Sequence, residues 1–199
     1  MIDDAFRTVV PRYAGPFVAL YSRLGLSPNH VTFIGFALAI LASFAVARGQ
    51  GWVALLLWWV SRIADGTDGH YARRSGRATA FGAYLDIVLD MAAYGAMVIG
   101  FAAAEPELAS RWTAMLFLYV LCITTALALG AQEERLARPA RDDRGLRLGA
   151  GLAEGGETGI AYSVFLLFPA WLPVTTAIWV GVLALTVVLR TILASRLLR

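Results

Sequence analysis

Apolar segments long enough to cross a bilayer recur along the whole chain, and they constrain its fold more than any other feature. Hydrophobic residues make up 59% of the 199 residues, whereas charged residues make up only 16%. This composition is typical of multi-span membrane proteins, in which each helix needs about 20 apolar residues to cross the hydrocarbon core. The sequence therefore predicts an all-α integral membrane protein that forms a single domain over residues 1–199.

Six transmembrane helices are expected from the apolar segments and the turn residues between them. Ser27 and Pro28 suit a helix start, because serine is a favoured N-cap and proline is tolerated at the first helical position. The expected spans cover residues 28–47, 52–66, 79–103, 112–131, 157–171 and 174–194. Before them, residues 1–26 carry apolar side chains at helical spacing, interrupted by arginines, which predicts an amphipathic juxtamembrane helix. A soluble N-terminal arm is the alternative.

The basic residues are distributed unevenly about these spans. All 17 are arginines, and most lie in the N-terminal segment, the loops after the second and fourth spans, and the C-terminal tail. Because arginine concentrates on the cytoplasmic side of membrane proteins, we expect both termini to be cytoplasmic. The positive-inside distribution explains the net charge of +3, so the charge does not indicate binding to nucleic acid and no nucleic-acid partner is expected. The absence of lysine excludes Schiff-base chemistry and phosphate-loop lysines.

Four aspartates lie in or beside two of the apolar segments. Asp65 and Asp68 are three residues apart, and Asp86 and Asp90 are four apart, so each pair lies on one face of a helix. Residues 69–77 are rich in glycine and arginine and predict a short turn, which would bring the two pairs together at the cytoplasmic surface. Carboxylates this close repel one another unless a cation compensates them. Mg²⁺ prefers oxygen ligands and often binds with phosphates, and two such ions could clamp a phosphoryl group.

Other interpretations of these acids stay open from their spacing alone. They could form a proton relay or an ion path in a membrane transport protein. They could also be structural partners of Arg62, Arg73 and Arg74. A relay would space its acids through the thickness of the membrane, whereas these four cluster on one side.

The segment from residue 65 to residue 90 resembles the signature of the CDP-alcohol phosphatidyltransferases. That signature reads D-x-x-D-G-x-x-A-R, eight residues, and then G-x-x-x-D-x-x-x-D. The matching residues are Asp65, Asp68, Gly69, Ala72, Arg73, Gly82, Asp86 and Asp90. Nearly the whole chain also resembles an uncharacterised bacterial inner-membrane branch of this family. The resemblance implies a multi-pass enzyme of a bacterial-type inner (plasma) membrane that forms a homodimer. The arginine distribution places its aspartate site on the cytoplasmic side.

The resemblance also implies a role for each matching residue. Asp65, Asp68 and Asp86 would hold two Mg²⁺ or Mn²⁺ ions, and Asp90 would be the general base while also contacting a metal. The implied nucleotide-binding residues are Asn29, Thr32, Gly69, Ala72, Arg73, Thr79 and Gly82. The implied reaction, in phospholipid biosynthesis, moves a phosphatidyl group from CDP-diacylglycerol to a small alcohol or polyol (phosphate) and releases CMP. The reverse assignment, a soluble CDP-alcohol and a diacylglycerol acceptor, shares the same signature.

The acceptor is expected to bind in the last three spans. Arg135 and Arg138 begin an arginine series that could bind a phosphorylated alcohol. The alternative is that these arginines are cytoplasmic charge in contact with headgroups, and we prefer it. Glu154 and Glu157, at the start of the fifth span, could hold hydroxyls or a cationic acceptor, or pair with the arginines. The identity of the acceptor alcohol does not follow from the sequence.

Overall fold

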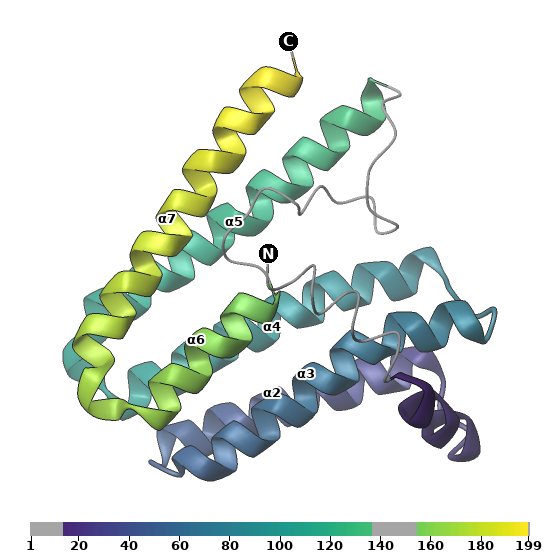
Figure 1. Ribbon diagram of the computed structural model, residues 1–199, viewed down its shortest axis with the longest axis horizontal. Coiled ribbons are helices and arrows are strands. Elements are labelled where there is room, and N and C mark those ends of the chain that lie inside the picture. The colour runs from purple at the N-terminus through teal and green to yellow at the C-terminus, as the bar shows by residue number, and fades with distance from the viewer. Residues whose placement is uncertain (1–13, 137–154, 199) are drawn as a thin grey trace.

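The computed structural model describes residues 14–136 and 155–198, and within those residues it contains helices and no strand (Figure 1). Residues 14–23 are helical, and the helices that follow are α2 (Pro28–Ala47), α3 (Gly51–Arg74), α4 (Ala80–Ala104), α5 (Ala109–Arg135), α6 (Gly155–Leu167) and α7 (Leu172–Leu197). Two short 3₁₀ helices, η1 (Pro106–Leu108) and η2 (Pro169–Trp171), precede α5 and α7. The prediction of an all-α protein is confirmed.

Four helices of the described residues are long and apolar enough to cross a membrane. These are α2, α4, α5 together with η1, and α7 together with η2. Helix α3 differs because Arg62, Asp65 and Asp68 interrupt its apolar sequence, and α6 has only 13 residues. The arrangement of six spans therefore stays a prediction. The juxtamembrane helix also stays a prediction, because residues 1–13 lie outside the described residues.

Helix α2 begins where the sequence predicts, and its first turns belong to the candidate site. The Ser27 hydroxyl oxygen accepts a hydrogen bond from the His30 backbone N–H at 3.3 Å, and His30 Nδ1 accepts one from the Ser27 N–H at 3.3 Å. This reciprocal cap satisfies two backbone donors at the helix start. Pro28 occupies the first helical position, where it lacks no hydrogen bond that a helix would need.

The turn between α3 and α4 is shorter than the sequence predicts. Residues 69–74 continue α3, although their glycine and arginine content predicts a turn over residues 69–77 and an end of the span at residue 66. The helix ends instead before Gly76, whose φ of 67° is a left-handed conformation that favours glycine. Helix α4 then starts at Thr79, whose hydroxyl oxygen accepts from the Gly82 N–H at 3.0 Å. Gly69 sits within the helix, where a glycine is tolerated at a modest cost.

The last two expected spans also have different bounds. Helix α6 ends at Leu167, and residues 168–171, which the sequence assigns to the fifth span, form the connection that contains η2. Helix α7 begins at Leu172 rather than at residue 174, because Pro173 fits the first turn of a helix, where its missing N–H costs nothing.

Small residues let α2 pack closely against both α3 and α4. A Cβ atom added to Gly100 of α4 would lie 2.5 Å from the Ser43 carbonyl oxygen, and one added to Gly35 would lie 3.3 Å from the Ala64 Cβ of α3. The Ser43 hydroxyl also donates to the Ala96 carbonyl oxygen at 2.5 Å. Glycine permits such close approach of helices, as it does in membrane proteins generally. Helices α3 and α4 touch each other little, so α2 sets their separation.

Aromatic side chains fill the core where the remaining helices meet this unit. Helix α5 packs along α7, and α6 contacts α3 and α7 (Figure 1). The Tyr162 hydroxyl donates to the Tyr94 carbonyl oxygen at 3.0 Å, and its ring centroid lies 5.2 Å from that of Trp58. Trp179 Nε1 donates to the Tyr119 hydroxyl at 2.9 Å. These contacts join the two parts of the bundle through one buried core.

Candidate active site

The four aspartates lie on α3 and α4, near the C-terminal end of α3 and the N-terminal end of α4. The Asp65 carboxylate interacts electrostatically with the carboxylates of Asp68, Asp86 and Asp90. Asp68 is buried, and the other three are partly exposed. Because α3 and α4 both pack on α2, the two aspartate pairs lie close enough to interact.

A guanidinium group connects the two aspartate-bearing helices. Arg62 Nη1 of α3 contacts Asp65 Oδ2 at 3.5 Å and also donates to Asp90 Oδ1 of α4. The Arg62 side chain is 9% exposed, so this cation is largely removed from solvent. The sequence names Arg62 only as a possible structural partner of the acids. Its spacing of three residues from Asp65 is the signal that places both on one helix face.

The first turns of α2 contact both aspartate helices. The Thr32 hydroxyl donates to Asp68 Oδ2 at 2.5 Å and to the Pro28 carbonyl oxygen at 3.2 Å. A Cβ atom added to Gly82 would lie 3.2 Å from Asn29 Oδ1 and 3.2 Å from the hydroxyl oxygen of the α4 N-cap. Gly82 therefore lets the Asn29 side chain approach the first turn of α4. The structure brings these expected nucleotide-binding residues together.

The end of α3 carries the remaining residues of the signature. A Cβ atom added to Gly69 would lie 3.5 Å from Arg73 Nη1, so the Arg73 side chain folds back along its own helix. Arg73 is exposed and Ala72 is partly exposed. Burial, and then the charge of Arg73, lower the pKa of His70. An exposed guanidinium beside the aspartates suits contact with a phosphate group.

Tyr94 is a site residue that the sequence analysis does not single out. It lies one helical turn after Asp90, and its side chain interacts with the Asp90 carboxylate. The spacing of four residues on α4 is the signal that could have identified it. Asp90 is thus contacted from two sides, by Tyr94 on its own helix and by Arg62 on α3.

The chemistry of the donor set suits a hard divalent cation, although the side chains are not gathered as direct ligands. Among the residues that the structure describes, no three acidic, histidine or cysteine side chains form a group that could hold a metal ion. Carboxylate and hydroxyl oxygens are nevertheless the donors that Mg²⁺ and Mn²⁺ take in proteins. Because Arg62 contacts Asp65 and Asp90, direct binding of a metal by either of these carboxylates requires side-chain movement.

The expected acceptor residues are only partly within the described residues. Glu157 is half-buried in the first turn of α6, and Arg135 is exposed in the last turn of α5. Arg138 and Glu154 lie outside the described residues. The structure therefore places Glu157 and Arg135 on two different helices, neither of which carries an aspartate of the signature.

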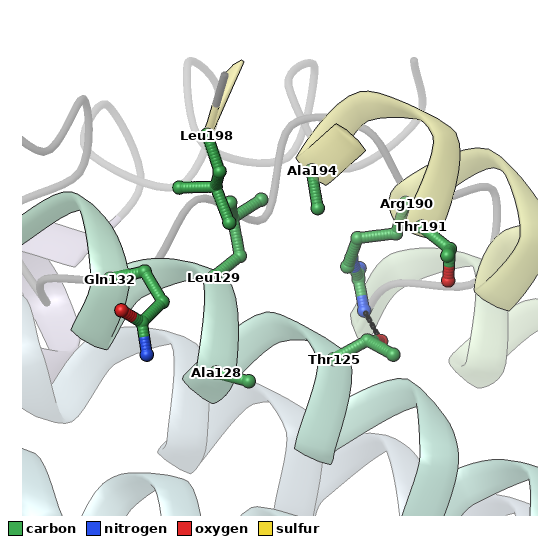
Figure 2. A pocket seen from close by; sticks show the side chains of 8 residues that line it. All are labelled: Thr125, Ala128, Leu129, Gln132, Arg190, Thr191, Ala194 and Leu198. Carbon is green, nitrogen blue, oxygen red and sulfur yellow. Dashed lines mark hydrogen bonds between the residues drawn. The ribbon is translucent and has the colours of Figure 1, made fainter. Parts of the chain in front are cut away.

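A cavity of about 230 Å³ lies between the C-terminal parts of α5 and α7 (Figure 2). Its lining residues are Thr125, Ala128, Leu129, Gln132, Arg190, Thr191, Ala194 and Leu198. The buried Arg190 side chain extends from α7 toward α5, where Nη1 donates to the Cys122 carbonyl oxygen at 2.5 Å and to the Thr125 hydroxyl at 3.5 Å. None of these lining residues belongs to the helices that carry the aspartates, so the cavity is separate from the candidate active site.

Comparison with known proteins identifies relatives along most of the chain. The family model described as CDP-alcohol phosphatidyltransferase matches residues 25–193. The inner membrane protein YnjF of Escherichia coli is 34% identical over 157 residues, which cover 77% of this chain and 76% of that protein. The phosphatidylinositol phosphate synthase of Cutibacterium acnes is 30% identical, and the alignment covers 97% of each chain.

Crystal structures of the phosphatidylinositol phosphate synthase PgsA1 of Mycobacterium tuberculosis have the same fold. The structure with CDP-DAG bound is 24% identical with a TM-score of 0.60, and the match covers 93% of this chain and 91% of that chain. The structure in complex with manganese and citrate is 21% identical with a TM-score of 0.62, and covers 92% and 87%. The family match spans the helices that carry the aspartates and most of the helices that follow. The chain is therefore an enzyme of the CDP-alcohol phosphatidyltransferase family.

Proposed function

We propose that this enzyme transfers a phosphatidyl group from CDP-diacylglycerol to a small alcohol or polyol, with or without a phosphate, and releases CMP. The observation that carries the proposal is the approach of Asp65, Asp68, Asp86 and Asp90 on two facing helices beside the start of α2. The CDP-DAG bound to mycobacterial PgsA1 and the phosphatidylinositol phosphate synthases among the relatives support the donor assignment.

Two divalent ions, Mg²⁺ or Mn²⁺, are proposed to bind at the four aspartates. The oxygen-rich donor set and the manganese complex of PgsA1 support this proposal. When bound, the ions would neutralise the pyrophosphate of the donor and the charge that develops on the departing CMP. The hydrogen bond from Thr32 fixes the orientation of Asp68, and Thr32 is itself held by the first turn of α2. One carboxylate of the set is thereby positioned by the fold before any ligand binds.

Asp90 is proposed to be the general base. The acceptor oxygen forms a bond to the phosphorus that carries the lipid, and the bond from that phosphorus to the CMP oxygen breaks, with the electron pair leaving on CMP. The proton of the acceptor hydroxyl passes to Asp90, whose side chain is 21% exposed and so accessible to a substrate. Tyr94, one turn further along α4, interacts with the carboxylate and favours one orientation, which a base needs to meet the hydroxyl.

The nucleotide is proposed to bind at the surface between α2, the end of α3 and the start of α4. The residues that would form this surface are Asn29, Thr32, Gly69, Ala72, Arg73, Thr79 and Gly82. The missing Cβ of Gly82 allows the Asn29 carboxamide to lie against α4, and the exposed Arg73 guanidinium can reach a phosphate. Replacing Arg73 by alanine should therefore weaken CDP-diacylglycerol binding. Unchanged affinity would indicate that Arg73 contributes only to the positive charge of the cytoplasmic side.

The acceptor is proposed to bind near the start of α6, with Glu157 and Glu154 near its hydroxyls. Arg135 and Arg138 would contact a phosphate if the acceptor carries one, and are otherwise cytoplasmic charge in contact with headgroups. Glu157 carries most of this proposal, because it is half-buried in a helix that packs on α3. Replacing Glu157 by glutamine is expected to raise the KM for the acceptor while the KM for the donor stays the same. A homodimer and the cytoplasmic position of both termini stay predictions.

The test is release of CMP by the purified protein in detergent. CDP-diacylglycerol and Mg²⁺ would be supplied with glycerol phosphate, inositol phosphate, inositol, serine, choline or phosphatidylglycerol as acceptors. A parallel reaction would contain CDP-choline and diacylglycerol, which tests the reverse assignment. Each reaction would be repeated with EDTA, because the proposal requires that activity depend on a divalent metal.

The outcomes separate the alternatives. CMP release that requires one acceptor of the panel and disappears in EDTA is the expected result, and it names the substrate. Release only from CDP-choline with diacylglycerol would replace the proposed donor by a soluble CDP-alcohol. Metal-independent release, or failure to bind CDP-diacylglycerol at all, would contradict the proposed site.

A further inference from the structure

Arg62 is a buried cation at the centre of the candidate site, and no position of the signature accounts for it. Its Nη1 atom contacts Asp65 Oδ2 and Asp90 Oδ1, and its Nη2 atom donates to the Ser61 hydroxyl at 3.1 Å. Ser61 is fully buried, and the Arg62 side chain is 9% exposed. The guanidinium is therefore the positive charge that the chain itself supplies to two of the four carboxylates.

Two aromatic rings form a support for this guanidinium that does not depend on the aspartates. The Arg62 Cζ atom lies 4.5 Å from the centroid of the Trp58 ring and 5.2 Å from that of Tyr94. Trp58 is completely buried and Tyr94 is 3% exposed, so both rings are fixed by the core. Arginine stacks favourably on such rings. The side chain could consequently lose its carboxylate contacts and still have a favourable place in the fold.

The hydrogen bonding of Arg62 is incomplete, which distinguishes it from a fully satisfied structural ion pair. Within the described part of the chain, its buried Nε–H has no hydrogen-bond acceptor. A buried ion pair stabilises a fold only when its remaining donors and acceptors are satisfied. One donor of the guanidinium is thus left unsatisfied, while Nη1 contacts the two carboxylates and Nη2 donates to Ser61.

The contacts of Arg62 conflict with those that the proposed function requires. Asp90 Oδ1 and Asp65 Oδ2 cannot be ligands of a divalent ion while the guanidinium contacts the same atoms, because the two cations repel and Mg²⁺ demands near-octahedral oxygen ligation. Either the metal binds without these atoms or Arg62 moves. The aromatic support beside the site makes movement of Arg62 the simpler solution.

We propose that Arg62 is an exchangeable counter-cation, which compensates Asp65 and Asp90 until a divalent ion replaces it. The inference rests on the proposed function, since it concerns the binding of that metal. In this role Arg62 is a positioning residue: it keeps the two carboxylates oriented across α3 and α4, and it competes with the metal for them. Competition of this kind lowers the apparent affinity for the metal by the cost of displacing the arginine.

The first test measures Mg²⁺ binding to the full chain in detergent by isothermal titration calorimetry. Replacing Arg62 by methionine removes the competing charge and keeps much of the side-chain volume. The dissociation constant for Mg²⁺ is expected to fall at least about fivefold, within the usual range of coupling between two ligands. Arg74→Met is the matched control, because it removes an exposed positive charge of the same helix outside the signature and should change the constant by less than about twofold.

The second test detects the movement of Arg62 itself. Trp58 is in contact with the guanidinium, so its fluorescence should change when Mg²⁺ displaces Arg62. We expect a Mg²⁺-dependent change in tryptophan emission in the wild-type protein that disappears in both Trp58→Phe and Arg62→Met. If Arg62→Met does not fold, Arg62→Gln serves in both tests, because its shorter neutral amide cannot replace the guanidinium.

The results distinguish failure of this inference from failure of the proposed function. Equal Mg²⁺ affinity in the wild-type protein and the Arg62 variant, with no change in tryptophan emission, would overturn the exchange while leaving metal-dependent CMP release intact. Absence of Mg²⁺ binding from every variant, together with metal-independent or absent CMP release, would overturn both. Mg²⁺ binding that is tighter in the Arg62 variant and unchanged in the control variant supports both the exchange and the proposed metal site.

Discussion

The two halves of the bundle are built by different means. In the N-terminal half, which comprises residues 14–104, small residues bring backbones together, as at Gly35 and Gly100, and polar side chains gather at one end. The C-terminal half, which comprises α5, α6 and α7, packs instead through large aromatic side chains such as Tyr162 and Trp179, which share one core with Trp58 and Tyr94 of the N-terminal half. The family signature lies entirely in the N-terminal half, whereas the expected acceptor residues belong to the C-terminal half or to the segment before α6.

This difference separates two kinds of sensitivity to substitution. A site held by close backbone approach loses its geometry when a single methyl group is added, because a helix backbone cannot yield locally. An aromatic core held by volume and a few hydrogen bonds tolerates changes that conserve shape. We therefore expect donor chemistry to fail with small changes in α2, α3 and α4, and acceptor preference to depend on the C-terminal half.

The largest expected effect is that of Asp90→Asn, which tests whether the chemistry resides in the N-terminal half. An amide cannot accept the proton of the acceptor, so the rate of CMP release should fall about 10²- to 10⁴-fold. Binding of CDP-diacylglycerol should be retained. Glu107→Gln, an exposed acid in η1 at the far end of α4, is the control and should keep wild-type turnover. Wild-type turnover in Asp90→Asn would show that Asp90 is not the base.

The next effect concerns the packing of α2 against α4. An alanine at Gly100 would place its Cβ 2.5 Å from the Ser43 carbonyl oxygen, and we expect this to reduce the free energy of unfolding by about 1–3 kcal/mol. At Gly181 of α7 no described atom lies within 4 Å of an added Cβ, so alanine should stabilise that helix by up to about 1 kcal/mol. Thermal unfolding in detergent measures the stability of both variants. Equal changes in melting temperature would show that close backbone packing is not confined to the N-terminal half.

A smaller effect is expected at the proposed nucleotide site. Gly82→Ala places a methyl group 3.2 Å from Asn29 Oδ1, which should weaken CDP-diacylglycerol binding about fivefold, or about 1 kcal/mol. Gly95→Ala is the control in the same helix, because its Cβ would lie at an ordinary 3.9 Å from Leu116 Cδ2. Titration with CDP-diacylglycerol measures both variants. Equal affinities would indicate that the Asn29 contact with α4 does not shape the nucleotide site.

The smallest effect tests the aromatic core. Tyr162→Phe removes the hydrogen bond to the Tyr94 carbonyl oxygen and leaves the ring in place, so the free energy of unfolding should fall by about 0.5–1.5 kcal/mol. Donor kinetics should change by less than about twofold, a difference of under 0.5 kcal/mol. The exposed Tyr84→Phe is the control for stability. A large loss of donor turnover in Tyr162→Phe would mean that the aromatic core also positions the aspartates.

Much of the helical framework could be predicted from local sequence. The start of α2 follows from Ser27 and Pro28, because a side-chain cap and a proline act within a single turn. The end of α3 could not be predicted in this way. Gly69 and Gly76 look alike in the sequence, yet only Gly76 adopts a positive φ, and the choice between them depends on how α3 and α4 are joined across α2.

Three conclusions were reached from the amino-acid sequence: the protein is helical, each of two aspartate pairs lies on one helix face, and the signature resembles that of a phosphatidyltransferase family. The first two follow from hydropathy and spacing within single segments, and the third follows from resemblance to the family signature. The contact of Arg62 with Asp90 could not be inferred in this way, because it joins α3 to α4 and depends on how the helices pack. The separation of these helices is set by their packing on α2 through Gly35 and Gly100, a long-range property that no local pattern encodes.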